Sequence, residues 1–350
     1  MRSVYLIRHG HPDFPLGTRI CLGQTDTPLG PLGRLQSVLL AHVFAAKPPA
    51  RVYTSPLRRA YDTAHYLSKS PIVIDSLTER ATGLWDGLTF DEIARRWPKE
   101  YAQRGENPTL TMPEGEDLEH AATRFANAIE DILRHQEGDA AIVAHKGVIG
   151  AFMLALNKNR RLPSLPYGAY WHLTAENHTL TLKEHAPAKP QPTLNRALCL
   201  TLLHTVAPKQ VVCHCEAVEA FALEIAAQLP LALDTTLIAQ AALLHDIART
   251  MPNHAQIGAQ WLEALGYPAI ANIVRQHHDI NTTHINEASL VYLADKCLQG
   301  TQRVSLRARF SASKAKCQSK EAQAAWERRW HAAETLQKTI NTYCGKEIIQ

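Results

Sequence analysis

The stretch that decides the fold of the first half is VYLIRHG, residues 4–10, in which an apolar run leads directly into an Arg-His pair. A second run, AIVAH at residues 141–145, repeats the pattern of a buried strand that ends in a histidine. In an open α/β sheet, the carboxyl ends of the strands border the crevice in which ligands bind. The two stretches therefore predict that Arg8, His9 and His145 meet at one edge of a sheet.

The surrounding sequence alternates between two kinds of pattern. Strand-like runs at 3–7, 51–54, 72–74 and 140–144 are separated by helical patterns at 33–46, 57–68, 90–97 and 118–135. Such alternation is typical of βαβ units, so we expect an α/β domain with a mostly parallel open sheet flanked by helices. Two further runs, 170–174 and 179–185, predict a terminal hairpin.

A Pro-rich segment at residues 186–195 divides the chain. Proline cannot continue a helix or a central strand, and a length of 350 residues favours two domains. We therefore expect an α/β domain at 1–185, a linker at 186–195 and an all-α domain at 196–350. The helical patterns of the second domain lie at 238–247, 257–265, 269–277, 288–298 and 319–343.

Composition excludes several classes of protein. The net charge is only +4 and no basic block is dense, so nucleic acid is not an expected partner. No signal peptide or membrane-spanning run is present, and seven cysteines without a CxxC pair are typical of reduced thiols. We expect a cytoplasmic protein that acts on a small phosphorylated metabolite or nucleotide. Its oligomeric state does not follow from the sequence.

The first half offers the residue types that phosphoryl transfer needs. An unprotonated imidazole is a competent nucleophile toward phosphorus, and His9 is the candidate. Arg8, Arg59 and His145 are candidates to bind the phosphoryl oxygens. Glu79 can act as the general acid if burial raises its pKa.

The order of five segments carries a resemblance. They are LIRHG at 6–10, GQTDTPL at 23–29, YTSPLRRA at 53–60, LTE at 77–79 with GLWDG at 83–87, and AHKG at 144–147. Together they resemble the histidine phosphatase (phosphoglycerate mutase-like) superfamily over residues 1–185, and most of all its α-ribazole phosphatase branch. The resemblance implies a phosphohistidine at His9, phosphate contacts from Arg8, Arg59 and His145, Glu79 as the proton donor, and no cofactor.

The sequence departs from this family's pattern at two places, and one residue that the family often has is not evident. The family usually has Glu or Gln and then Thr or Ser after Arg-His-Gly, whereas this chain has His11, Pro12 and Asp13. Lys146 replaces the glycine that often follows the second histidine, and a nearby Asn that often contacts the phosphate is not evident. These departures concern the choice of substrate more than the phosphoryl chemistry. The alternative interpretation is an Arg-His pair that merely caps a strand.

The helical half places candidate metal ligands on separate elements. His214 begins an apolar stripe, His245 and Asp246 follow an apolar helical run, and Asp295 shares a predicted helix face with Val291 and Leu298. A lone buried carboxylate is costly, whereas one that binds a metal is not. Imidazole and carboxylate together suit Mn, Fe, Co, Ni or Zn better than Ca.

The set His214, His245-Asp246 and Asp295 resembles the HD superfamily of metal-dependent phosphohydrolases across about residues 196–310. The resemblance implies metal binding by these four residues, with His254, His277 and His278 as candidates for a second metal. Arg249 and Lys296 are further candidates for phosphate contacts. The stretch ALLHDIAR at 242–249 is also similar to small HD enzymes that split dinucleoside polyphosphates. The alternative is a set of core histidines satisfied by hydrogen bonds.

These patterns together predict a bifunctional phosphohydrolase. The first domain would hydrolyse a small phosphomonoester, and the second would cleave a phosphoester or phosphoanhydride of a nucleotide-like metabolite. The two steps would follow one another if the second domain exposed the monoester that the first removes. Two alternatives stay open: a phosphoglycerate-type mutase in the first domain, and a regulator whose HD domain binds metal and nucleotide without turnover.

Overall fold

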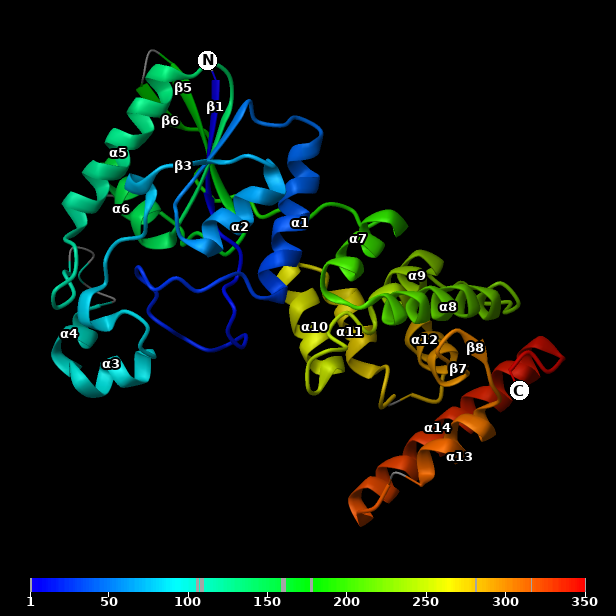
Figure 1. The fold of residues 1–350 in the computed structure, drawn as a ribbon. Helices are drawn as coiled ribbons and strands as arrows, with labels where there is room; N and C mark the ends of the chain where they lie inside the picture. Colours follow the sequence, from blue (N-terminus) through cyan, green and yellow to red (C-terminus); the bar gives the residue numbers. More distant parts are fainter. Residues whose placement is uncertain are drawn as a thin grey trace. The chain divides into compact units, whose positions relative to one another are not determined.

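The computed structural model describes residues 2–104, 107, 110–158, 162–176, 179–280, 282–315 and 317–349. The chain divides into two compact units, residues 1–192 and 193–350 (Figure 1). The division falls inside the predicted linker, but both ends of that segment belong to folded structure. Ala188 and Tyr170 exchange backbone hydrogen bonds at 2.9 and 3.0 Å, and Asn195 caps the first helix of the second unit.

A six-stranded mixed sheet forms the centre of the first unit. Its strands are β1 (Arg2–Arg8), β2 (Arg51–Thr54), β3 (Ile72–Val73), β4 (Ala140–Ala144), β5 (Tyr170–Glu176) and β6 (Thr179–Leu182), in the order β3-β2-β4-β1-β5-β6. The first four are parallel to one another, whereas β5 and β6 form an antiparallel hairpin beside β1. The α/β class with a largely parallel sheet is confirmed, although β6 ends three residues earlier than predicted.

Helices cover both faces of this sheet. Helices α1 (Pro31–Ala45) and α2 (Arg58–Leu67) lie on one face, and α5 (Leu118–His135) and α6 (Lys146–Leu156) lie on the other (Figure 1). Alternate residues of β1 serve the two layers, because Leu6 belongs to the buried cluster with Phe125 of α5 and Ile7 to the cluster with Leu40 of α1. The sheet is therefore buried on both sides, as its apolar strands predict.

Short elements connect β3 to α5. They are the 3-10 turns η1 (Asp75–Leu77) and η2 (Gly83–Trp85) and the helices α3 (Phe90–Arg96) and α4 (Pro98–Gln103). A capping box fixes the start of α3, since Thr89 accepts from the Glu92 amide and Glu92 accepts from the Thr89 amide. Gly83 adopts φ +54°, and a Cβ there would lie 2.1 Å from the Pro113 carbonyl oxygen. Only glycine fits this position, which begins the predicted motif at 83–87.

The strand register brings the candidate histidines together. Arg8 on β1 pairs with Ala144 on β4, so the next residues, His9 and His145, leave the sheet at the same edge. On the other side of β4, the Ser55 amide donates to the Val143 carbonyl oxygen at 3.0 Å, which continues the pairing of β2 beyond its last residue. Residues from three strand ends therefore meet at one edge.

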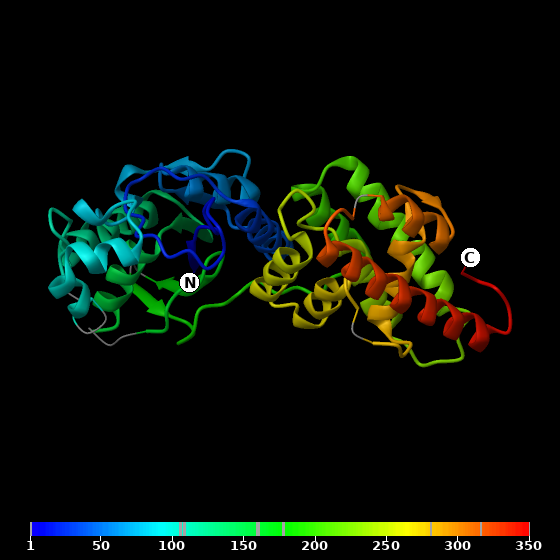
Figure 2. The same ribbon diagram turned by 90° about the horizontal axis from the view of Figure 1, so that it is seen from below.

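The second unit is helical in its described residues, apart from a short hairpin of two strands with two residues each. Its elements are α7 (Arg196–Val206), α8 (Lys209–Ala226), α9 (Thr235–Leu244), α10 (His254–Leu265), α11 (Pro268–Gln276), α12 (Glu287–Lys296), β7 (Leu298–Gln299), β8 (Gln302–Arg303), α13 (Leu306–Lys314) and α14 (Lys320–Cys344). Helices α8, α9, α11 and α12 pack together, and α14 packs along α12 and α13 (Figure 2).

Two predicted helix ends in this unit are wrong. Helix α9 ends at Leu244, so His245 and Asp246 lie in the turn after the helix rather than within its last turn. Helix α12 ends at Lys296, and Leu298 belongs to β7, so Asp295 and Leu298 do not share a helix face. Asp295 is nevertheless buried as expected, because every residue of α12 after Glu287 is buried.

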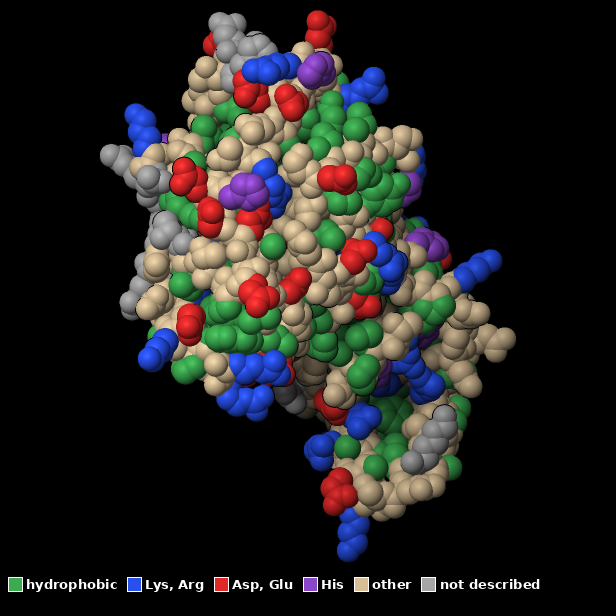
Figure 3. All heavy atoms as spheres, turned by 60° about the vertical axis from the view of Figure 1, so that its left-hand side comes forward, with side chains coloured by type: hydrophobic (Ala, Val, Ile, Leu, Met, Phe, Trp, Pro, Cys, Tyr) green, Lys and Arg blue, Asp and Glu red, His purple; other side chains and the backbone are tan. Residues whose placement is uncertain are grey.

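The surface agrees with the modest net charge. On the face drawn in Figure 3, acidic and basic side chains are interspersed over most of the area. In the part of the chain that the structure describes, no helix has both the length and the apolar character needed to span a membrane.

Candidate active sites

The structure holds the His9 imidazole in its neutral form. Its Nδ1 lies 2.7 Å from the Gly10 carbonyl oxygen, which can only accept, so Nδ1 carries the proton and Nε2 keeps its lone pair. Burial lowers the pKa of His9 well below its ordinary value, and the nearby Arg59 and Arg8 lower it further. The imidazole is therefore unprotonated at neutral pH, as nucleophilic attack requires.

His145 shows the opposite tautomer. Its Nε2 lies 2.8 Å from the Ser55 hydroxyl, and that hydroxyl also accepts from the Leu57 amide at 3.2 Å. The Ser55 hydroxyl keeps its own hydrogen to donate, and when it donates to Nε2 the hydrogen of His145 is on Nδ1. Within the described residues His145 Nδ1 has no hydrogen-bond partner. The centre of the His145 ring lies 5.0 Å from the centre of the His9 ring. His145 can thus donate to an anion placed next to His9.

Two arginines complete a buried group of donors. Arg59 is fully buried on α2 and donates to the carbonyl oxygens of Gly23 and Thr25, both at 2.7 Å. Arg8 donates to the Leu165 carbonyl oxygen at 2.9 Å. In the part of the chain described, the Nε atoms of both arginines have no hydrogen-bond partner. Buried unpaired donors are costly unless an anion binds them, so this group fits a phosphoryl ion.

The loop that holds Arg59 is itself held by one carboxylate. Asp86, next to Trp85, accepts from the amides of Gly23, Gln24 and Thr25 at 2.8 to 2.9 Å. The carbonyl oxygens of this loop then receive Arg59. The segments at 23–29 and 83–87 belong to one set of predicted motifs. Asp86 of the second segment fixes the loop of the first, and that loop in turn orients Arg59.

Glu79 lies at the amino end of α6. Its carboxylate accepts from the amides of Arg80, Gly147 and Val148 at 2.7 to 2.9 Å. Burial raises the pKa of Glu79, while these three hydrogen bonds and Arg59 oppose the rise. The net upward shift is what a general acid needs, and Glu79 lines the same cavity as His9.

A cavity of about 570 Å³ is lined by Arg8, His9 and Glu79, whereas Arg59 and His145 are not among its described lining residues. Its lining includes three residues that the motifs did not predict as site residues: Arg19, Arg104 and Tyr167. Tyr167 supports Arg8, whose Cζ lies 3.4 Å from the centre of the ring. Tyr167 follows no strand and carries no motif, so no sequence signal identified it. Lys146 also lines the cavity, where the family's glycine would leave no charge.

In the second unit, one group of candidate ligands comprises His214, His245 and Asp295. They lie on α8, after α9 and on α12, and their ligand atoms are within 4.8 Å of one another. His214 Nε2 is 3.1 Å and His245 Nε2 is 3.8 Å from Asp295 Oδ1. The Nδ1 atoms of both histidines face carbonyl oxygens, of Gly300 and Ala242, so both Nε2 lone pairs are directed into the group.

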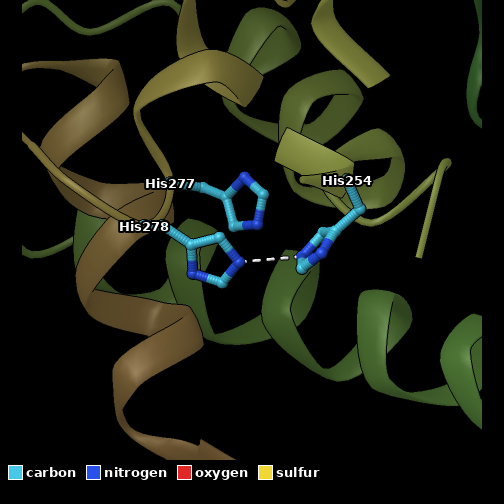
Figure 4. A group of neighbouring side chains, drawn as sticks. All are labelled: His254, His277 and His278. Atoms are coloured by element: carbon cyan, nitrogen blue, oxygen red, sulfur yellow. Dashed lines mark hydrogen bonds between the residues drawn. The ribbon is translucent and has the colours of Figure 1, made fainter. Parts of the chain in front are cut away.

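A second group comprises His254, His277 and His278. His254 begins α10, the other two follow α11, and the three side chains converge (Figure 4). His278 Nε2 lies 2.8 Å from His254 Nε2, and burial lowers the pKa of His278 to about 2. The sequence proposed these histidines as candidates for a second metal, and the structure brings all three together.

Asp246 lies between the two groups. Its Oδ1 is 3.1 Å from His254 Nε2 and 3.5 Å from His277 Nε2, while its Oδ2 is 3.7 Å from His245 Nε2. His277 Nδ1 lies 2.6 Å from the Val274 carbonyl oxygen, so its Nε2 turns a lone pair toward a carboxylate oxygen. Two acceptors that face each other in a buried site need a proton or a metal cation between them.

The donor set therefore fits a divalent transition metal. Neutral imidazole nitrogens and carboxylate oxygens are its ordinary ligands, and the Nδ1 hydrogen bonds orient the rings as metal sites require. Within the described residues, His245 Nε2 and His277 Nε2 are buried without a hydrogen-bond partner. Although burial opposes it, the facing histidines lower the pKa of Asp246, which keeps it ionised.

Arg249 and Lys296 border this site. Lys296 Nζ donates to Asp295 Oδ2 at 2.7 Å, and Arg249 donates to His254 Nε2 at 3.0 Å. Both side chains line a cavity of about 460 Å³ together with Asp246 and Asp295. The structure thus places both predicted phosphate contacts beside the ligand groups.

The fold and the cluster of two histidines and two arginines are typical of a histidine phosphatase, and comparison with known families agrees. The sequence model of the histidine phosphatase superfamily (branch 1) matches residues 4–195, and that of the HD domain matches residues 211–299. The chain belongs to the histidine phosphatase superfamily and carries an HD domain after it.

Individual relatives cover the first unit. A glucosyl-3-phosphoglycerate phosphatase of Mycobacterium tuberculosis is 32% identical over 170 residues, which are 45% of this chain and 76% of the relative. A metal-independent phosphoserine phosphatase of Arabidopsis thaliana is 32% identical over 165 residues, 45% of this chain and 69% of the relative. The solved structure of a mycobacterial glucosyl-3-phosphoglycerate phosphatase with inorganic phosphate has a TM-score of 0.50 at 27% identity and covers 55% of this chain and 100% of its own.

These findings show that the protein is a phosphate-ester hydrolase. They confirm the two predicted families. The α-ribazole branch within the superfamily stays a prediction.

Proposed function

We propose that the first unit hydrolyses a small phosphomonoester through a phosphohistidine at His9. The observation that carries this proposal is the lone pair of His9 Nε2 beside the buried donors of Arg8, Arg59 and His145. Nε2 attacks phosphorus, Glu79 protonates the departing oxygen, and a water molecule then attacks the phosphohistidine. Glu79, now ionised, takes the proton of that water, and His9 is regenerated.

The cavity lining favours an acidic metabolite as the substrate. Besides Arg8 and His9, the lining of this cavity includes the basic residues Arg19, Arg104 and Lys146. Glu79 is the one acid among its described lining residues. Positive charge in a partly enclosed site attracts anionic substrates. A phosphomonoester with a second anionic group, such as a carboxylate, matches this distribution.

We further infer that the second unit holds a divalent transition metal and hydrolyses a phosphoester or phosphoanhydride of a nucleotide or nucleotide-like metabolite. A metal bound there supplies a Lewis acid that neutralises phosphoryl charge and makes water more acidic. Asp246 and Asp295 with their histidines would hold it. Arg249 and Lys296 line the same cavity as Asp246 and Asp295, which supports a role for them in binding phosphate oxygens of the substrate.

The test of the first proposal is a chemical quench during turnover of a phosphomonoester panel in the presence of a chelator. The wild type should accumulate acid-labile, base-stable phosphate on protein and release inorganic phosphate. His9→Ala should show neither, whereas His65→Ala, which removes an exposed histidine of α2, should match the wild type. A phosphorylated His9→Ala protein would contradict the assignment. Transfer of the phosphoryl group to a second phosphomonoester, which forms a bisphosphate, instead of to water would indicate a mutase.

A further inference from the structure

The metal-ligand groups occupy only one side of the 460 Å³ cavity. The other side is formed by α13 and α14, which follow the HD match that ends at residue 299. These two helices pack against each other (Figure 1), and they contribute Arg309, Phe310, Trp326 and Arg329 to the lining. This wall, defined by those four residues, lies outside the residues that the HD model matches.

The aromatic part of the wall is fixed in place. Trp326 Nε1 donates to the Phe310 carbonyl oxygen and to the Ser313 hydroxyl, both at 3.1 Å. The Phe310 ring meets the Trp326 ring edge to face at 5.9 Å, and Lys314 Nζ lies 5.0 Å from the centre of the indole. Trp326 is only partly buried and lines the cavity. A rigid aromatic surface therefore borders the space in front of the metal ligands.

The lining of the cavity has more positively charged than negatively charged side chains. Arg249, Lys296, Arg309 and Arg329 are positive, whereas the acids among the described lining residues are Asp246 and Asp295, both in the ligand groups. Arg329 has an ion pair with Asp279 at 3.0 Å. The Arg309 guanidinium has no hydrogen-bond or ion-pair partner among the described residues. The cavity thus combines a metal-ligand end, an aromatic side and a free arginine.

We propose that the wall binds the nucleoside part of a nucleoside diphosphate or longer polyphosphate. The indole of Trp326 contacts the planar base, and Arg309 binds a phosphate beyond the one at the ligand groups. This inference rests on the proposed metal-dependent hydrolysis by the same unit and names its substrate class. A ringless phosphomonoester would leave the aromatic side of the cavity uncovered and Arg309 unpaired.

The test uses the full chain loaded with Mn²⁺ and two probes that resist hydrolysis, α,β-methylene-ADP and methylenediphosphonate, which lacks the nucleoside. Calorimetry should show that the wild type binds the nucleotide analogue about tenfold more tightly than the diphosphonate, because base–aromatic contact has about that effect. Trp326→Leu should lose about this tenfold for the analogue and bind the diphosphonate unchanged. Trp326→Phe, which keeps a ring, should retain most of the affinity.

Arg309→Gln gives a second variant that leaves the aromatic contacts intact. It should weaken both probes, and bound Mn²⁺ per chain should equal that of the wild type in every variant that folds. Two results would contradict nucleoside binding by the wall without contradicting the metal site. One is wild-type affinity for the analogue in both Trp326→Leu and Arg309→Gln, and the other is equal affinity of the wild type for the two probes. Failure of the Mn²⁺-loaded wild type to bind either probe would overturn both proposals.

Discussion

At the scale of single residues, both sites set the tautomer of their histidines with backbone carbonyl oxygens. His9, His245 and His277 each direct Nδ1 to a carbonyl oxygen within 2.6 to 2.7 Å. Each therefore keeps a lone pair on Nε2, which is the atom that we propose attacks phosphorus in one unit and that faces the candidate metal position in the other. The same local device serves nucleophilic and metal chemistry.

Ser55 contacts His145 and would act on a bound phosphate only through it, so we expect it to be a positioning residue. Ser55→Ala should lower kcat/KM for phosphomonoesters about fivefold, since one buried hydrogen bond contributes on the order of 1 kcal/mol. Nitrogen NMR of the wild type should show His145 protonated on Nδ1, and the variant should show both tautomers. An unchanged NMR spectrum together with lost activity would mean that Ser55 supports the fold rather than the tautomer.

Glu79 should produce a pH limb that depends on the leaving group. Because its pKa is raised, Glu79 is protonated below that value, and the acid is lost as the pH rises through it. The rate of phosphoenzyme formation from an alkyl phosphate should therefore fall across that range in the wild type. Glu79→Gln should be slow and without this limb for alkyl esters but should lose much less with aryl phosphates, which need less protonation. Equal losses for both esters would contradict the acid role.

At the scale of elements, strand ends and one loop position the phosphate pocket. Strands β1 and β4 deliver the histidines, and the loop at 23–25 receives Arg59 while Asp86 holds its three amides. A carboxylate that accepts several amides fixes a loop more firmly than neutral acceptors do. Asp86 therefore controls the orientation of Arg59 without contacting it.

Asp86→Ala should release this loop and misplace Arg59. We expect a roughly 10- to 100-fold loss of kcat/KM, which is the effect of small misplacements in active sites. The affinity for vanadate should fall in parallel. Asp91→Ala, which removes an exposed carboxylate from the first turn of α3, is the matched control and should keep full activity. Wild-type vanadate affinity in Asp86→Ala would show that the loop holds its shape without the carboxylate.

The sequence predicted the elements that follow periodic patterns and missed the contacts made between them. Apolar runs identified β1 and β4, so His9 and His145 could be placed at one sheet edge. Tyr167 lies in a loop whose path depends on tertiary packing, and no pattern marked it. The end of α12 was predicted two residues late because Leu298 continues the apolar spacing, although it pairs with Arg303 in a short hairpin.

At the scale of the whole molecule, each of the two units has its own buried core and its own site. Asp246→Ala should remove metal-dependent hydrolysis and much of the bound Mn²⁺ or Co²⁺ and leave phosphomonoester hydrolysis intact. Metal content and both activities, measured in parallel on wild type and variant, check this. Loss of the monoesterase in the variant would show that the two sites are coupled, and full metal occupancy would contradict the ligand assignment.

The pairing of β1 with β4 has a consequence for how the chain tolerates changes in length. Every residue of β4 is buried, and successive side chains point to opposite faces of the sheet. One inserted residue within β4 would turn the residues after it to the other face and carry His145 away from His9. An insertion after the exposed Glu137 would only lengthen the turn before the strand. A scan of single-residue insertions should therefore abolish phosphatase activity within residues 140–145 and spare it a few residues upstream.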